Sequence, residues 1–155
     1  MKVIVVMGVS GCGKTSVGRL LAEETGAVFI EGDDHHAPEN VRKMASGVAL
    51  NDEDRLGWLQ TLANLIREVR GPAVMACSAL KEDYRKILGE ACFVYLKGSP
   101  ELLAERLADR RDHFMPPELL ASQLETLEPP ESGLILDIRE SPGELVAQIR
   151  THFGS

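Results

Sequence analysis

The stretch Gly8-Val9-Ser10-Gly11-Cys12-Gly13-Lys14-Thr15 decides the fold of this 155-residue chain. It matches the pattern G-x-x-x-x-G-K-[ST] and follows directly on the apolar run at 3–7. Glycines in such a loop let successive backbone N–H groups turn towards phosphate oxygens, and the next helix adds the positive end of its dipole. A glycine turn that arose by chance is the alternative. The preceding strand and the complete match favour a phosphate-binding loop for a nucleoside triphosphate.

The end of this loop carries the residues with chemical roles. Lys14 would reach the β- and γ-phosphates, and the hydroxyl of Thr15 would hold Mg²⁺. Ser16 follows on the first turn of the helix and belongs with them to the predicted nucleotide-binding residues. The sequence therefore predicts a nucleoside triphosphate and Mg²⁺ as ligands of the segment from Gly8 to Ser16.

Length and charge limit the classes of function. A chain of 155 residues forms one domain, and its net charge of −7 argues against a broad surface for nucleic acid or acidic membrane. We see no signal peptide and no run of the ~20 apolar residues that a membrane helix needs. The three cysteines are predicted to be reduced interior thiols, and a redox role for Cys12 is the less favoured alternative. We expect a cytoplasmic protein.

The order of apolar and helical patterns predicts the architecture. Apolar runs predict five strands, at 3–7, 27–30, 73–77, 92–96 and 134–138. Helical patterns are expected from Lys14 onward and at 41–44, from the acidic start at 51–54 to Val69, and at 84–88, 100–111, 117–127 and 143–152. Strands that alternate with helices predict an α/β fold. We expect the P-loop NTP hydrolase fold, with a five-stranded parallel sheet flanked by helices.

Two acidic residues follow the second predicted strand. Glu31 and Asp33 are two positions apart, which in an extended chain sends both side chains to the same side. Glu31 could support Mg²⁺ through its waters, while Asp33 could accept a proton from a substrate hydroxyl. The alternative is a solvated acidic turn, but the nearby phosphate loop favours a functional site.

The third strand argues for a kinase. It ends in Cys77-Ser78 instead of the Asp-Glu of hydrolytic ATPases, and the chain has no Asn-Lys-x-Asp motif to bind guanine. Ser78 is expected at the carboxyl edge of the sheet, where ligands of such folds bind. These features favour phosphoryl transfer to a small molecule.

The run Asp33-Asp34-His35-His36 also allows a transition-metal site. Metal ligands must converge on one point, whereas adjacent residues point in different directions. We favour a single histidine, His36, turned towards an anionic or hydroxylated substrate.

A cationic segment lies before a proline break. Arg106, Arg110 and Arg111 are followed by His113 and then by Pro116-Pro117. A solvated helix end is the simple alternative. In a net-acidic protein with a phosphate loop we prefer a lid at about 110–120 that places Arg110 or Arg111 over the transferred phosphate.

Several segments taken together are specific to one family: 7–15, Glu31-Gly-Asp33 with His36 and Asn40, 43–47, 50–55 with Trp58-Leu59, 77–81 with Tyr84-Arg85, 95–98, Arg106-Leu with Arg110, 113–115, Ser122-Gln123, and 127–129. In this set the chain resembles the gluconate kinases (gluconokinases), small relatives of shikimate and nucleoside-monophosphate kinases. It departs from that family in three places: an alanine follows His36, Gly57 stands where the family usually has proline, and Glu31 replaces the common aspartate.

The resemblance implies that ATP phosphorylates the 6-hydroxyl of D-gluconate, giving 6-phospho-D-gluconate for carbohydrate catabolism, and that the protein is a homodimer. Its implied catalytic residues are Lys14, Asp33 and Arg110, and Arg106 and Arg110 would also bind ATP. The substrate's carboxylate needs cations, and its polyol chain needs mixed donors and acceptors. Arg55, Lys81 and Arg85 could supply the cations, and Asp33, His36, Asn40, Ser78, His113 and Gln123 the polar contacts. We expect Trp58 to pack in the core and favour this over stacking of its ring against the sugar.

Two other functions remain open at the level of sequence. One is a related kinase for shikimate, adenylylsulfate or a nucleotide. The other is a nucleotide-binding regulatory module without turnover, against which Asp33 argues because such a module needs no base.

Overall fold

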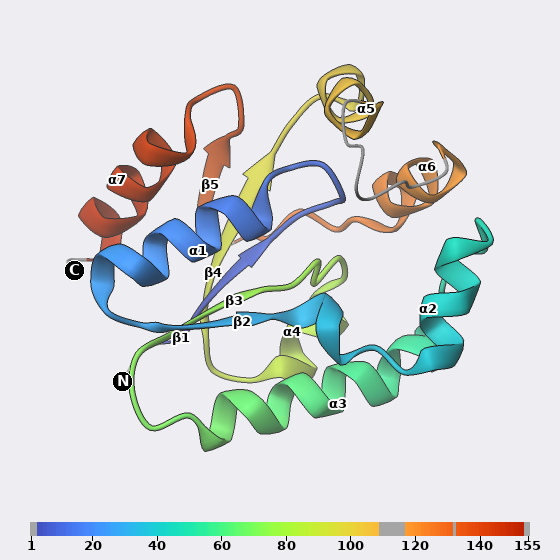
Figure 1. Ribbon diagram of the computed structural model, residues 1–155, viewed down its shortest axis with the longest axis horizontal. Coiled ribbons are helices and arrows are strands. Elements are labelled where there is room, and N and C mark those ends of the chain that lie inside the picture. Colours follow the sequence, from blue (N-terminus) through green and yellow to red (C-terminus); the bar gives the residue numbers. More distant parts are fainter. Residues whose placement is uncertain (1–2, 109–116, 132, 154–155) are drawn as a thin grey trace.

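A single parallel sheet forms the centre of the computed structural model, which describes residues 3–108, 117–131 and 133–153 (Figure 1). The sheet has the strand order β2-β3-β1-β4-β5. Its strands are β1 (Val3–Met7), β2 (Val28–Glu31), β3 (Ala73–Ala76), β4 (Cys92–Lys97) and β5 (Leu134–Asp137). The predicted α/β fold with five parallel strands is confirmed, and each strand lies within one or two residues of its expected place.

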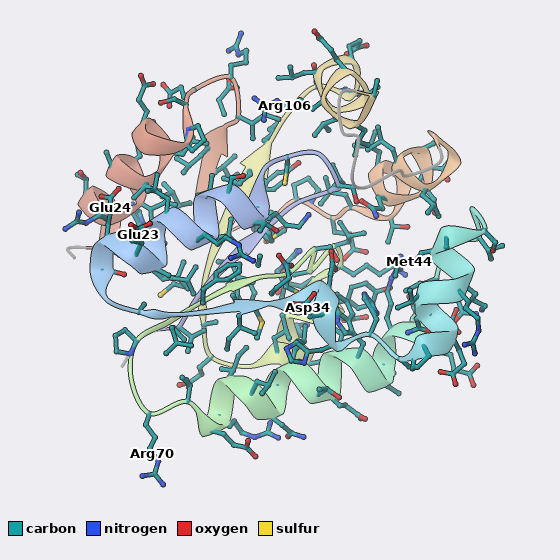
Figure 2. All side chains as sticks on the ribbon, viewed as in Figure 1. Glu23, Glu24, Asp34, Met44, Arg70 and Arg106 are labelled. Atoms are coloured by element: carbon teal, nitrogen blue, oxygen red, sulfur yellow. The ribbon has the colours of Figure 1, made fainter. Side chains whose placement is uncertain are left out.

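Helices cover both faces of this sheet (Figure 1). They are α1 (Lys14–Thr25), α2 (Pro38–Ala45), α3 (Asp52–Glu68), α4 (Glu82–Leu88), α5 (Pro100–Ala108), α6 (Pro117–Thr126) and α7 (Pro142–Phe153). The helices α1 and α7 pack against each other on one face, and α3 packs against α4 on the other (Figure 1). Outside the core, Arg150 on α7 contacts Glu24 on α1, with 3.0 Å between the charged groups. Figure 2 labels Glu24 at the end of α1.

The centre of the sheet is its most buried part. The strands β1 and β3 are buried along their whole length, as their continuous apolar sequences predict. The edge strands are less covered, because Val28 on β2 and Ile135 on β5 are exposed. The phosphate loop leaves the sheet from β1, so a strand that is buried along its whole length positions it.

Local signals explain where α1 and α3 begin. Gly13 has a φ of 94°, a backbone conformation that favours glycine, and α1 starts at the next residue. Before α3, the side chain of Asn51 accepts a hydrogen bond from the N–H of Asp54 at 2.8 Å, and the carboxylate of Asp54 accepts one from the N–H of Asn51 at 3.1 Å. This reciprocal capping fixes the acidic start that the sequence predicted.

The segment after β2 differs from the expectation. Glu31 is the last residue of β2 and pairs with Ala76, while a 3-10 helix spans Gly32–His35. A Cβ atom on Gly32 would lie 2.5 Å from the carbonyl oxygen of Ala76, so only glycine fits where the chain turns. The chain is therefore not extended from Glu31 to Asp33. The prediction that both side chains point to the same side of an extended strand is wrong. The turn itself sets their positions.

No helix within the described residues is both long enough and apolar enough to cross a membrane.

Candidate active site

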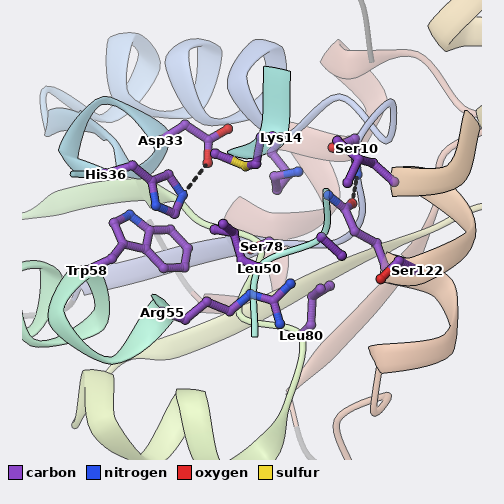
Figure 3. A pocket seen from close by; sticks show the side chains of 14 residues that line it. Ser10, Lys14, Asp33, His36, Leu50, Arg55, Trp58, Ser78, Leu80 and Ser122 are labelled. Carbon is purple, nitrogen blue, oxygen red and sulfur yellow. Dashed lines mark hydrogen bonds and ion pairs between the residues drawn. The ribbon is translucent and has the colours of Figure 1, made fainter. Parts of the chain in front are cut away.

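A pocket opens at the carboxyl edge of the sheet, between the phosphate loop, the 3-10 helix, α3 and α6 (Figure 3). It brings together side chains that are more than 100 positions apart in the sequence. Its lining consists of Ser10, Lys14, Asp33, His36, Met44, Ala49, Leu50, Arg55, Trp58, Ser78, Leu80, Leu119, Ser122 and Gln123.

The phosphate loop forms one wall of the pocket. The ammonium group of Lys14 donates a hydrogen bond to the carbonyl oxygen of Val9 at 3.2 Å and makes no ion pair with any described carboxylate. The N–H of Gly8 donates to the carbonyl of Ser78 at 3.3 Å, which ties the loop to the end of β3. The N–H of Ser10 donates to the amide oxygen of Gln123 at 2.7 Å, so α6 is tied to the loop as well.

The two residues predicted for the metal site lie in contact. The hydroxyl of Thr15 donates to the carboxylate of Glu31 at 2.5 Å. Within the described ranges, no group of three His, Cys, Asp or Glu side chains converges as metal ligands, at residues 33–36 or elsewhere. A hydroxyl beside one carboxylate fits Mg²⁺, which keeps several waters and is completed by substrate phosphates.

Asp33 and His36 lie at the opening of the pocket, on the wall opposite the phosphate loop. The side chain of Asp33 is 64% exposed, and its carboxylate lies 3.8 Å from Nε2 of His36 (Figure 3). The ring of His36 stacks on Trp58 with 4.1 Å between the ring centroids and 18° between the planes. The indole N–H of Trp58 donates to the carbonyl of Gly32 at 2.7 Å. Trp58 therefore holds both the 3-10 helix and the imidazole while it is itself buried.

The surroundings of His36 favour its neutral form, because they lower its pKa. Burial is the largest cause that lowers its pKa from 6.5; the nearby Arg55 adds to this, and Asp33 opposes it. Nδ1 of His36 is buried and has no hydrogen-bond partner among the described residues. A neutral imidazole with an unpaired ring nitrogen in a pocket is suited to a substrate hydroxyl.

Arg55 brings a cation to the same wall. It extends from α3 into the pocket, and only 8% of the residue is exposed (Figure 3). Its guanidinium donates to the phenol oxygen of Tyr84 at 2.9 Å. It forms no ion pair with a carboxylate of the described residues. A buried cation without a carboxylate in direct contact is costly, so this position is suited to an anionic group.

The structure does not bring three of the expected substrate residues into the pocket lining. Arg85 donates to the carbonyls of Ala79 and Glu128 and to the carboxylate of Glu82. Lys81 donates to the carboxylate of Asp52 at 2.9 and 3.2 Å. The amide of Asn40 donates to the backbone carbonyl of Asp54 at 2.8 Å. These contacts join the loops around the pocket to each other.

Arg106 lies on the phosphate side of the site. It extends from α5 and donates to the carbonyl of Ile138 at 2.5 Å (Figure 2). Its Nη1 would lie 4.0 Å from a Cβ atom built on Gly13, so it stands beside the phosphate loop. Arg110, Arg111, His113 and most of the expected lid at 110–120 lie outside the described residues.

The apolar part of the lining was not predicted. Met44, Ala49 and Leu50 come from α2 and the loop after it, and Leu80 follows β3. Ser122 on α6 was only noted beside Gln123. A leucine directly before a helix cap, as at Leu50, indicates that the chain turns towards the interior there. Periodicity alone does not show that this side chain lines the pocket.

The three cysteines are free thiols. Cys12 and Cys77 are buried, and burial raises the pKa of the Cys77 thiol to about 12. Cys12 and Cys77 lie in the interior as expected, whereas Cys92 is half-buried.

Comparison with known proteins gives consistent matches. The family model described as shikimate kinase matches residues 10–128. A probable gluconokinase of Mus musculus is 44% identical, and the match covers 95% of each chain. A crystal structure of a gluconokinase from Sinorhizobium meliloti is 44% identical, with a TM-score of 0.86 and coverage of 99% of this chain and 97% of that one. A sugar kinase from Janibacter sp. HTCC2649 is 41% identical, with a TM-score of 0.93 and coverage of 99% and 95%.

Proposed function

Because this chain belongs to the gluconokinase family, we propose that it transfers the γ-phosphoryl group of ATP to the 6-hydroxyl of D-gluconate. The observation that carries the choice of substrate is Arg55, a buried cation in the pocket without a carboxylate partner among the described residues. Gluconate carries a carboxylate at one end and the reacting hydroxyl at the other. Its carboxylate would pair with Arg55, and guanidinium groups suit carboxylates because they can bind both oxygens.

The phosphate loop would hold the triphosphate. Backbone N–H groups of the loop and the start of α1 would bind the β- and γ-phosphates, and Lys14 would leave the carbonyl of Val9 to contact them. Arg106, beside Gly13, would add a cation on this side, and Arg110 would contact the transferred phosphate. These charges neutralise the oxygens of a loose transition state, in which positioning and electrostatics do most of the work.

Asp33 would act on the acceptor. Its carboxylate stands at the mouth of the pocket, whose lining also includes Lys14, so it can accept the proton of the 6-hydroxyl as that oxygen bonds to phosphorus and the bond to ADP breaks. His36, neutral and fixed on Trp58, would accept a hydrogen bond from another hydroxyl at Nδ1. Ser78, Gln123 and, from the segment outside the described residues, His113 would supply further polar contacts.

Mg²⁺ would be held by the hydroxyl of Thr15, with Glu31 acting through a water, and would neutralise phosphate charge. The remaining parts of the proposal are a single domain over residues 1–155, a lid at about 110–120, a homodimer and a cytoplasmic location.

A panel assay tests the function. ADP release would be measured with D-gluconate, glucose, shikimate, adenylylsulfate and nucleosides as acceptors. Gluconate should be the best substrate, because glucose would leave Arg55 unpaired. Faster turnover of glucose or shikimate would overturn the assignment. Tight ATP binding with no turnover of any acceptor would instead indicate a regulatory module.

A further inference from the structure

We propose that Lys81, Asp52 and Tyr84 form a relay that aims Arg55 at the carboxylate of the acceptor. This inference rests on the proposed function, because it concerns the same carboxylate. None of these three residues lines the pocket, so they are positioning residues that act through Arg55. We call them the arginine relay.

The relay is a continuous chain of hydrogen bonds between α3 and α4. Nη1 of Arg55 donates to the phenol oxygen of Tyr84 at 2.9 Å, and the phenol donates to Oδ1 of Asp52. Lys81 donates to both oxygens of Asp52, at 2.9 and 3.2 Å. Asp52 and Arg55 lie on the first turn of α3, while Lys81 and Tyr84 lie at the start of α4. The relay therefore fixes the two helix starts to each other beside the pocket.

The direction of each hydrogen bond is determined by the chemistry of the phenol. A phenol has one proton, and once Tyr84 gives it to Asp52, only oxygen lone pairs remain for the guanidinium. Asp52 keeps its charge, because the hydrogen bonds from Tyr84 and Lys81 lower its pKa. Burial and the bond to Asp52 raise the pKa of Tyr84, so the phenol stays protonated. Lys81 and Asp52 thus orient the phenol.

A phenol is a suitable support for a substrate-binding arginine. A carboxylate in direct contact with Arg55 would neutralise it and compete with the substrate. The neutral oxygen of Tyr84 orients the guanidinium and leaves its charge for the ligand. The Tyr84 ring adds a second support, since its centroid lies 5.5 Å from Cζ of Arg55. Figure 3 shows the guanidinium directed into the pocket.

The relay also explains Lys81. The sequence suggested it as a direct contact for the substrate, but its ammonium is paired with Asp52. Its ammonium also lies 5.6 Å from the centroid of the Tyr84 ring. Its effect on the substrate would pass through the orientation of Arg55.

Tyr84→Phe tests the relay, because it keeps the ring and removes only the hydroxyl. We expect the KM for gluconate to rise about tenfold, since a hydrogen bond to a charged group is lost, while kcat and the KM for ATP change less than about twofold. Asp52→Asn should raise the same KM about threefold, because the phenol loses its preferred acceptor. The matched control is Asp137→Asn, which removes a carboxylate paired with Arg139 at 2.7 Å and outside the pocket lining; it should leave all constants unchanged.

The outcomes separate the relay from a structural role and from the proposed function. An unchanged KM for gluconate in Tyr84→Phe, with normal turnover by the wild-type protein, would overturn the relay alone. A parallel loss in kcat, in both KM values and in thermal stability would also overturn it, because a merely structural role predicts that result. Absence of gluconate turnover in the wild-type protein would overturn the proposed function and the relay with it.

Discussion

The two walls of the pocket are built in different ways. The phosphate wall comes mainly from one contiguous segment, from Gly8 to Ser16, and relies on backbone N–H groups and the start of α1. The acceptor wall combines side chains from the 3-10 helix, from α3, from the loop after β3 and from α6. A local motif can encode the first wall, whereas the second exists only when distant segments pack.

The walls are alike in one respect. Lys14 on the phosphate wall and Arg55 on the acceptor wall both contact neutral oxygens, the carbonyl of Val9 and the phenol of Tyr84. Neither forms an ion pair with a carboxylate in the described part of the chain. Both cations are therefore available for anionic groups of the two substrates. Variants on each wall therefore show whether that wall serves only its own substrate.

Lys14→Ala should have the largest effect. Loss of the cation that contacts the transferred phosphate should lower kcat about 10²- to 10³-fold. Steady-state ADP release with gluconate measures it, with circular dichroism to check the fold. Lys86→Ala, on the exposed side of α4, is the control and should be normal. Near-normal turnover by the folded Lys14→Ala variant would contradict the assignment of Lys14 to the active site.

Asp33→Asn should lower kcat about 10²-fold, because the acceptor hydroxyl loses its proton acceptor and its orientation. Calorimetric ATP binding should be retained, so the paired measurement is ATP affinity and single-turnover transfer to gluconate. Asp34→Asn, on the neighbouring exposed residue, controls for the loss of a charge. If ATP affinity collapsed while transfer at saturating ATP stayed near normal, Asp33 would belong to the phosphate wall as a metal-site residue.

Arg55→Met should raise the KM for gluconate about 30-fold and leave the KM for ATP unchanged. The preference for gluconate over glucose should fall by a similar factor, since only gluconate has a carboxylate to lose. Competition experiments with both acceptors measure this ratio. An unchanged preference would show that the carboxylate binds elsewhere.

Arg85→Met is the matched change at the other buried arginine. Arg85 is 4% exposed, and its hydrogen bonds go to two backbone carbonyls and Glu82. Ala79, whose carbonyl it binds, has a φ of 45°, which is unusual for a residue with a side chain. We expect the free energy of unfolding in urea to fall by about 2–3 kcal/mol, with little change in the KM for gluconate. A large rise in that KM at unchanged stability would assign Arg85 to the acceptor wall.

The smallest effect concerns pH and His36. Its pKa is lowered in the folded protein, so the unfolded chain binds more protons at pH values between that pKa and 6.5. The stabilisation by neutral His36 is complete above about pH 6.5 and is lost as the pH falls through the folded pKa. His36→Gln should therefore flatten the pH dependence of the free energy of unfolding below pH 6.5. If the free energy of unfolding changed equally with pH in the wild type and in His36→Gln, the lowered pKa of His36 would be contradicted.

Much of the fold could be predicted, because its signals are local. Apolar runs, the acidic start of α3 and the glycine loop each depend on neighbours within a few residues, and the structure has all of them. The 3-10 helix at Gly32–His35 was missed, because its cause is the close approach of Gly32 to the carbonyl of Ala76 on another strand. The stacking of His36 on Trp58 likewise has no signal in the local sequence.

The sequence by itself determined the phosphate wall, the parallel sheet and the types of residue available for an acid substrate. Only the tertiary structure decided which of the three candidate cations faces the pocket. Arg55, Lys81 and Arg85 look equivalent in the sequence, but packing of α3 against α4 gives Lys81 a carboxylate and Arg85 two carbonyls, and it leaves Arg55 with a neutral phenol. The physical reason is that a cation's partners are set by contacts between distant segments, which no local pattern records.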